Sequence, residues 1–264
     1  MINTPLAQGK RWPGWVKQRL AVHGAPVGIL MLDRMPGPGI RPYIPGDTGN
    51  ATTWSVPVRY KTVSTLNVTR IFGPDGEALT SAVVQAAAEL VSEGAQLITS
   101  GCGYLIRYQE AVRDAVDVPV FLSSLLLAPF LEMMLPRDKA LGIIVASKTV
   151  MTQQGLLKAT GLGANIGRRV VVAGLEDTPV FAATFLSGKG DLDVSACEKD
   201  LVDTAMALLN DRPDIGMLLL ECGNLPPYAA AVQQATGGIP VFDFTSLIEF
   251  FIGGLIRRPF TGLI

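Results

Sequence analysis

The sequence contains one histidine, three cysteines and few charged residues, which make up 17% of its 264 positions. With only His23 to supply an imidazole, no His/Cys cluster has the spacing of metal ligands, so we expect no metal site. The odd cysteine count, without a disulfide-rich pattern, favours a reducing, cytoplasmic setting. A formal net charge of −1 gives no electrostatic reason to expect nucleic acid or an anionic membrane as a partner.

Long apolar runs are also missing. The most apolar stretch, 121–135, is too short to span a bilayer and carries Ser123, Ser124 and Glu132. The N-terminal segment lacks the continuous apolar core of a secretory signal. The glycine-rich stretches match neither a dinucleotide-binding fingerprint nor a phosphate-binding loop, so the residues indicate no nucleotide cofactor.

Instead, the sequence has short apolar runs without alternation, such as 27–32, 141–145 and 215–220. Such runs are typical of parallel strands that are covered on both faces. Strand and helix patterns alternate along the chain, which predicts an α/β fold. The pattern begins again near Leu141, and the last strand and helix resemble those that end the first copy. We therefore predict two similar lobes. The first contains residues 1–124 plus 240–264, and the second contains residues 125–239.

Two cysteines occupy matching places in the two copies. Cys102 begins a Cys-Gly-Tyr-Leu segment and Cys222 begins a Cys-Gly-Asn-Leu segment. Each is predicted to follow a strand and precede a helix, at the sheet edge where open α/β sheets bind ligands. A helix N-terminus there can hold a carboxylate and lower the pKa of a thiol, while Gly103 and Gly223 let the backbone approach a ligand. Two opposed thiols can remove a proton from one face of a carbon and return one to the other face, as a cofactor-free racemase requires.

Three polar residues beside these cysteines are candidates for substrate binding. Thr99 and Ser100 could donate hydrogen bonds to a carboxylate, or could simply end a strand. Asn224 could orient a ligand or cap the helix that follows it.

Two more candidates, Ser147 and Thr149, follow the first strand of the second copy. Thr149 could instead cap a helix predicted at 149–160. Cys197, inside another predicted helix, is expected to be a buried packing residue.

The long segment 33–55 is rich in glycine and proline, and loops of this length are often functional. Its residues Asp47 and Asn50 are typical of a turn. Because a loop after a first strand can reach the ligand edge of a sheet, we also count both as candidates for substrate binding.

The motifs 99–103 (Thr-Ser-Gly-Cys-Gly) and 220–226 (Leu-Glu-Cys-Gly-Asn-Leu-Pro) resemble those of the aspartate/glutamate racemase superfamily, which includes hydantoin racemases, maleate isomerases and arylmalonate decarboxylases. The resemblance extends from about Val27 to the end of the chain. It implies two flavodoxin-like lobes, each with a parallel sheet flanked by helices, an active site in the cleft between them, and no cofactor. It also implies that Cys102 and Cys222 are the two acid/base thiols.

The sequence departs from that family at two places. Many members have threonine where this chain has Gly223, and glutamate racemases tend to have Asn-Thr where it has Gly103-Tyr104. We therefore expect a cofactor-independent racemase or isomerase that acts on a small carboxylate, such as an amino acid or a derivative of one. The alternatives are a cis–trans diacid isomerase, a decarboxylase that uses one thiol, or a non-catalytic two-lobed ligand-binding protein. The substrate, its handedness and any homo-oligomer are left open.

Overall fold

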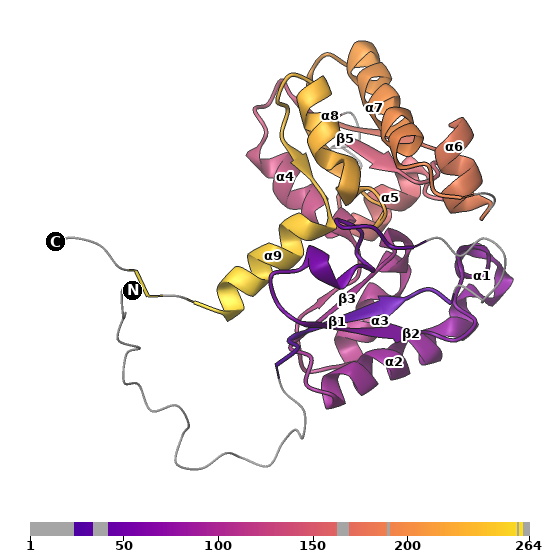
Figure 1. Cartoon of the computed structure of the whole chain (residues 1–264), viewed down its shortest axis with the longest axis vertical. Coiled ribbons are helices and arrows are strands. Elements are labelled where there is room, and N and C mark those ends of the chain that lie inside the picture. The colour runs from indigo at the N-terminus through magenta and orange to yellow at the C-terminus, as the bar shows by residue number, and fades with distance from the viewer. Residues whose placement is uncertain (1–23, 34–41, 163–168, 189–190, 258, 261–264) are drawn as a thin grey trace, which may run out of the picture.

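The structure is a computed structural model that describes residues 24–33, 42–162, 169–188, 191–257 and 259–260. It contains two parallel four-stranded sheets, one above the other in Figure 1, with strand orders β2-β1-β3-β4 and β6-β5-β7-β8. The strands of the first sheet are β1 (Val27–Met31), β2 (Val58–Thr62), β3 (Leu97–Ser100) and β4 (Val120–Phe121). Those of the second sheet are β5 (Ala140–Val145), β6 (Val170–Gly174), β7 (Ile215–Leu220) and β8 (Val241–Phe242). The predicted α/β fold with two lobes is confirmed.

Helices flank each sheet because their apolar residues recur on one face. Val83, Ala87 and Leu90 of α2, for example, are buried in the first lobe. The first lobe contains η1 (Ala51–Thr53), α1 (Val68–Phe72), η2 (Pro74–Leu79), α2 (Thr80–Ser92), η3 (Gly103–Tyr108) and α3 (Gln109–Ala115). The second contains α5 (Gln153–Thr160), α6 (Pro179–Phe181), η6 (Ala182–Leu186), α7 (Val194–Asp211), η7 (Pro226–Tyr228) and α8 (Ala229–Ala235). In the part of the chain that the structure describes, no helix combines the length and apolar character needed to span a membrane.

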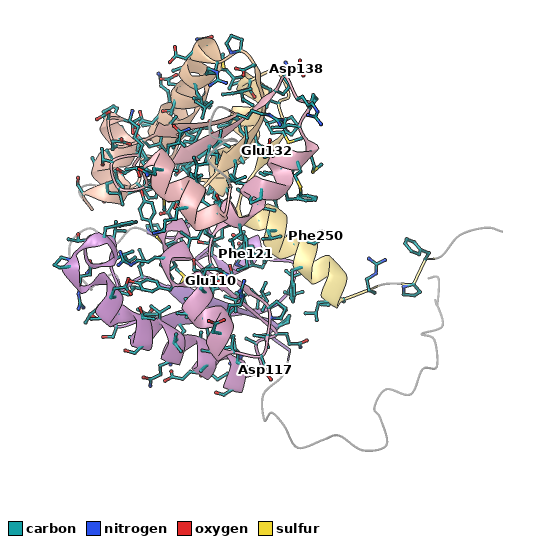
Figure 2. All side chains as sticks on the ribbon, turned by 180° about the vertical axis from the view of Figure 1, so that it is seen from behind. Glu110, Asp117, Phe121, Glu132, Asp138 and Phe250 are labelled. Carbon is teal, nitrogen blue, oxygen red and sulfur yellow. The ribbon has the colours of Figure 1, made fainter. Side chains whose placement is uncertain are left out.

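The helix that follows each sheet's last strand packs on the other lobe. After β4, η4 (Ser124–Leu127) leads into α4 (Ala128–Met134), which lies against β5 of the second sheet. After β8, α9 (Phe244–Leu255) returns to the first sheet, where Phe244 contacts Phe121 edge-to-face at 6.0 Å between ring centroids. Phe121 lies beside α9 in Figure 2, and Phe250 projects from the same helix. The two lobes are thus held together by exchanged helices.

This exchange changes one predicted boundary. The prediction assigned 240–264 to the first lobe, and α9 does pack on the first sheet, through Phe244, Ile248 and Ile252. However, β8 pairs with β7, so Val241–Phe242 belong to the second sheet. The chain therefore crosses between the lobes after β8 and not before it. His23 and residues 34–41 lie outside the described residues.

Candidate active site

The two cysteine motifs meet at the interface between the lobes. A Cβ atom added to Gly223 would lie 2.5 Å from the carbonyl oxygen of Gly101, and one added to Gly103 would lie 2.5 Å from the carbonyl oxygen of Glu221. In each case the residue after one cysteine touches the residue before the other. The contact is therefore reciprocal, and it brings the two strand ends, with Cys102 and Cys222 at their centres, to the same place. Only glycine fits at both contact positions.

The surroundings of the three thiols differ. Cys102 is 8% exposed and Cys222 is partly exposed, whereas Cys197 is fully enclosed in α7. The packing role expected for Cys197 fits this burial. Burial raises the pKa of the Tyr104 phenol well above its usual range, and the charges of Glu221, Cys222 and Cys102 raise it further. All three acidic groups therefore lie close enough to Tyr104 to act on it.

Both cysteines are followed by tight 3₁₀ turns and not by regular α-helix. The N–H of Leu105 donates to the carbonyl of Cys102, and that of Leu225 donates to the carbonyl of Cys222, each over 3.0 Å. The α-helices begin later, at Gln109 and Ala229, and have seven residues each. The helices predicted to follow the two cysteines therefore exist, but they start one turn or more beyond the thiols. This distance weakens the helix-terminus effect that we expected on both thiols.

Cys222 belongs to a chain of polar contacts that crosses the interface. Its Sγ atom lies 3.9 Å from Oδ1 of Asn224, whose Nδ2 donates to Oδ1 of Asp47 over 2.6 Å. Asp47 is 1% exposed, and its Oδ2 accepts the N–H of Ile44 over 3.2 Å. Because the Nδ2 group of Asn224 donates to Asp47, the Oδ1 atom of the same amide faces the Cys222 sulfur. The structure thus brings the two predicted residues Asp47 and Asn224 together beside Cys222.

Thr48 occupies the space that a side chain at position 223 would need. Its N–H donates to the carbonyl of Gly223 over 3.1 Å, and its Oγ1 lies 3.5 Å from the carbonyl oxygen of Gly101. A Cβ on Gly223 would lie 2.6 Å from this Oγ1 atom. The space that a side chain after the second cysteine would occupy is therefore filled by a hydroxyl from another loop. No signal in the sequence pointed to Thr48.

Two of the other predicted residues shape the polypeptide around the site. The Ser100 hydroxyl lies 2.7 Å from the Leu122 carbonyl oxygen and 2.9 Å from that of Cys102, so it fixes the turn at Cys102. Asn50 caps η1, accepting the N–H of Thr52 over 2.9 Å and donating to the Tyr43 carbonyl over 2.8 Å. The side chains of Ser100 and Asn50 thus hydrogen-bond to the backbone of the first lobe and stabilise its local conformation.

Thr99 points away from the thiols. In the first sheet it is in register with Ile29 and Phe121, which belong to the core under α9. Residues in register on parallel strands share a face, so the Thr99 side chain lies on that side of the sheet. The structure does not bring it to Cys102.

Ser147 and Thr149 lie at the carboxyl end of β5, with their hydroxyl oxygens 2.7 Å apart. The Ser147 carbonyl accepts the phenol of Tyr104 over 3.4 Å, which ties this edge to the first lobe. The predicted cap at Thr149 is wrong, because α5 begins at Gln153 and Thr152 is its cap, accepting the N–H of Gly155 over 3.1 Å. Thr149 is left in an exposed turn before the helix.

Glu221 is an acidic residue that the sequence analysis missed. It is 1% exposed, and its Oε2 accepts the N–H of Ala146 over 3.3 Å while Oε1 lies against Gly103. Burial raises the pKa of this carboxyl to about 8. The available signal was an acid at the end of an apolar strand, next to Cys222. No group of three or more His, Cys, Asp or Glu residues suited to a metal ion occurs among the described residues.

Solved structures identify the fold. An allantoin racemase from Klebsiella pneumoniae matches with a TM-score of 0.56 at 15% identity, over 87% of this chain and 89% of that one. A glutamate racemase from Bacillus anthracis gives 0.55 at 14% identity, over 88% and 82%. A sulfate-associated arylmalonate decarboxylase variant gives 0.56 at 18% identity, over 87% and 92%. The chain shares the two-lobed fold of these enzymes, and the fold that the resemblance implied is confirmed.

The sequence relatives are named as lyases and not as racemases. A dimethylsulfoniopropionate lyase from Durusdinium sp. clade D is 29% identical over 97% of this chain and 86% of that protein. Dimethylsulfoniopropionate lyases 5 and 7 from Emiliania huxleyi are 29% and 30% identical over 67% and 66% of this chain, which spans 37% and 52% of their lengths. No family model matches the sequence. The fold is thus shared with racemases and a decarboxylase, while these sequence relatives are lyases.

Proposed function

We propose that this protein is a lyase that cleaves dimethylsulfoniopropionate or a closely related sulfonium carboxylate. The observation that carries the proposal is the similarity to a lyase of that name along 97% of the chain. The fold is compatible with an enzyme, because the solved structures that share it include a glutamate racemase and an allantoin racemase. The prediction of a small carboxylate substrate is kept, whereas the isomerase reaction becomes the second candidate.

The chemistry requires one base. Dimethylsulfoniopropionate has a carboxylate at C1 and a dimethylsulfonium group on C3. The base removes a proton from C2, the electrons of the broken C–H bond form the C2–C3 double bond, and the C3–S bond breaks. Its electron pair leaves with sulfur as neutral dimethyl sulfide, acrylate remains, and the proton passes from the base to solvent. No oxidant or second substrate is needed.

We assign the base to Cys222. It is the more exposed of the two interface thiols. Once its thiolate has taken the C2 proton, the resulting S–H group can donate to Oδ1 of Asn224, which lies 3.9 Å away and is held in that orientation by Asp47. The backbone N–H groups of the two cysteine turns are the donors suited to the negative charge that develops on the carboxylate.

Racemisation or isomerisation of a small carboxylate is the second candidate. The specific observation in its favour is the reciprocal contact of the two cysteine motifs, which sets two thiols at equivalent positions of the two lobes. Elimination needs a single proton acceptor, whereas two-base racemisation needs both thiols. Single-cysteine variants therefore separate the two candidates.

The test measures dimethyl sulfide in the headspace and acrylate in solution after incubation with dimethylsulfoniopropionate. The wild-type protein should form both in equal amounts, and Cys222→Ala should lower the rate by roughly 10²–10⁴. Cys102→Ala should retain measurable cleavage, and Cys197→Ala is the matched control with wild-type rates. If no sulfide forms, but the C2 hydrogen of a chiral carboxylate exchanges with deuterium only when both interface thiols are present, the protein is a racemase.

A further inference from the structure

Glu221 is a buried acid without a counter-charge. The described residues form seven ion pairs, and none of them includes Glu221. The Ala146 N–H, at 3.3 Å, is the donor to its carboxyl group. Burial without a counter-charge disfavours the ionised form of a carboxyl group, which explains why the pKa of Glu221 is raised. Packing does not require such a group, because an apolar or amide side chain would fill the space without that penalty.

The carboxyl group lies beside both cysteine motifs. Glu221 directly precedes Cys222, its Oε1 lies against Gly103 beside Cys102, and its charge acts on the Tyr104 phenol together with the charges of both thiols. Tyr104 is 2% exposed, and its hydroxyl donates to the Ser147 carbonyl over 3.4 Å. A carboxyl group and an aromatic ring, one from each lobe, therefore lie beside the two cysteine motifs.

We propose that Glu221 and Tyr104 form the binding site for the positively charged group of the substrate, and that this site selects an onium carboxylate over a neutral one. The inference rests on the proposed function and deepens it. A carboxylate and an aromatic ring are the two kinds of group that bind onium cations in proteins. In a substrate whose C2 lies between the thiols, the sulfonium sulfur is two bonds from C2, so its methyl groups lie within reach of both side chains.

This arrangement would also favour the release of products. The positive charge on sulfur disappears as dimethyl sulfide departs, so the carboxylate holds the substrate more tightly than the products. The products are a neutral sulfide, which has no attraction for Glu221, and acrylate, whose charge is repelled by it. Release of products is therefore favoured by the same residue that selects the substrate.

The test compares two ligands of nearly identical shape that are poor substrates for elimination. Both probes keep the carboxylate. The cationic probe, 3-(trimethylammonio)propionate, carries a trimethylammonium group at the other end, and the neutral probe, 4,4-dimethylpentanoate, carries an uncharged tert-butyl group in that place. Dissociation constants are measured by titration calorimetry at pH 9, above the raised pKa of about 8, so that the Glu221 carboxyl is ionised, for the wild-type protein and for Glu221→Gln. We expect the wild-type protein to bind the cation at least about tenfold more tightly than the neutral probe, which corresponds to about 1.4 kcal/mol. Glu221→Gln should reduce this preference to near unity and leave the affinity for the neutral probe unchanged.

Two further variants separate charge from packing. Glu221→Asp keeps the charge and should retain part of the preference for the cation. Glu176→Gln removes an acid elsewhere on the second lobe, one that accepts the N–H of Lys148 over 3.1 Å, and should leave the preference intact. An equal loss of affinity for both probes in Glu221→Gln would mean that Glu221 only supports the fold of the site, and would overturn the proposal.

The outcome is independent of the lyase assay. If the wild-type protein cleaves dimethylsulfoniopropionate but Glu221→Gln keeps the full preference for the cation, the cation site is wrong and the lyase function stands. If the preference depends on Glu221 but no sulfide is released, the cation site stands and the proposed reaction is wrong. A wild-type protein without any preference for the cation overturns the inference directly.

Discussion

Replacing Glu221 with glutamine should make the protein more stable, and the gain should grow with pH. The pKa of this carboxyl rises from an ordinary 4.5 to about 8 in the folded protein because the group is buried. Below pH 4.5 it is neutral in both the folded and the unfolded chain, so it does not affect stability there. Between pH 4.5 and 8 only the unfolded chain is ionised, so stability is progressively lost as the pH rises from the unfolded pKa to the folded pKa, and the loss is complete above pH 8.

The size of this gain in stability follows from the difference between the unfolded and folded pKa values of Glu221. At about 1.36 kcal/mol per unit, the 2.5 units between 4.5 and 7 correspond to about 3 kcal/mol at pH 7, and the full shift corresponds to about 5 kcal/mol above pH 8. Because glutamine remains neutral, Glu221→Gln should recover most of this amount at pH 7 and little at pH 4.5. Part of the gain is lost if the amide N–H₂ group fits poorly against Gly103.

Urea denaturation at pH 4.5, 6, 7 and 8.5 measures this difference. The control is Glu198→Gln on the exposed side of α7, which should change stability by less than about 0.5 kcal/mol at every pH. A gain for Glu221→Gln that is the same at all four pH values, or a loss at all of them, would refute the reasoning. If the variant is more stable yet loses the preference for a cation, the wild-type protein is less stable because of a residue that it needs for binding, as is common at functional sites.

Three further outcomes follow from the site. Iodoacetamide should label Cys222 faster than Cys197, because Cys197 is fully enclosed, and equal rates would show that the interface thiol is as inaccessible as a core residue. Gly223→Ala should destabilise the protein by roughly 1–3 kcal/mol, since its Cβ would lie 2.5 Å from the Gly101 carbonyl oxygen, and an unchanged denaturation midpoint would argue against the close contact of the motifs. Asn224→Ala should lower kcat and alter the pH–rate profile, because the Cys222 sulfur loses its acceptor, and a wild-type profile would remove the amide from the mechanism.

The sequence allowed the fold to be predicted well because its signals are local and repeated. Uninterrupted apolar runs such as 215–220 identify buried parallel strands, and β7 covers the same residues. Helix starts were less accurate. Thr149 and Thr152 are equally good caps by residue type, and only the turn after β5 decides that Thr152 begins the helix. The pairing of Val241–Phe242 with β7 was also beyond local signals, because it depends on where the chain crosses between the lobes.

The site was predicted in part, for a related reason. The duplicated cysteines were visible because both copies retain a Cys-Gly pair at a strand end. Thr48 and Glu221 gave no comparable signal, since their roles depend on contacts between segments far apart in the chain. The hydroxyl of Thr48 lies next to Gly223 only because a loop of the first lobe packs on the second. The raised pKa of Glu221 arises only because the folded protein buries its carboxyl group.

The direct test of the central claim is the reaction of the purified wild-type protein with dimethylsulfoniopropionate, followed by quantifying dimethyl sulfide and acrylate. The account predicts equal amounts of both products, with the rate reduced by roughly 10²–10⁴ in Cys222→Ala and retained in Cys197→Ala. Absence of both products from the wild-type protein, or the same rate in Cys222→Ala as in the wild-type protein, would contradict it.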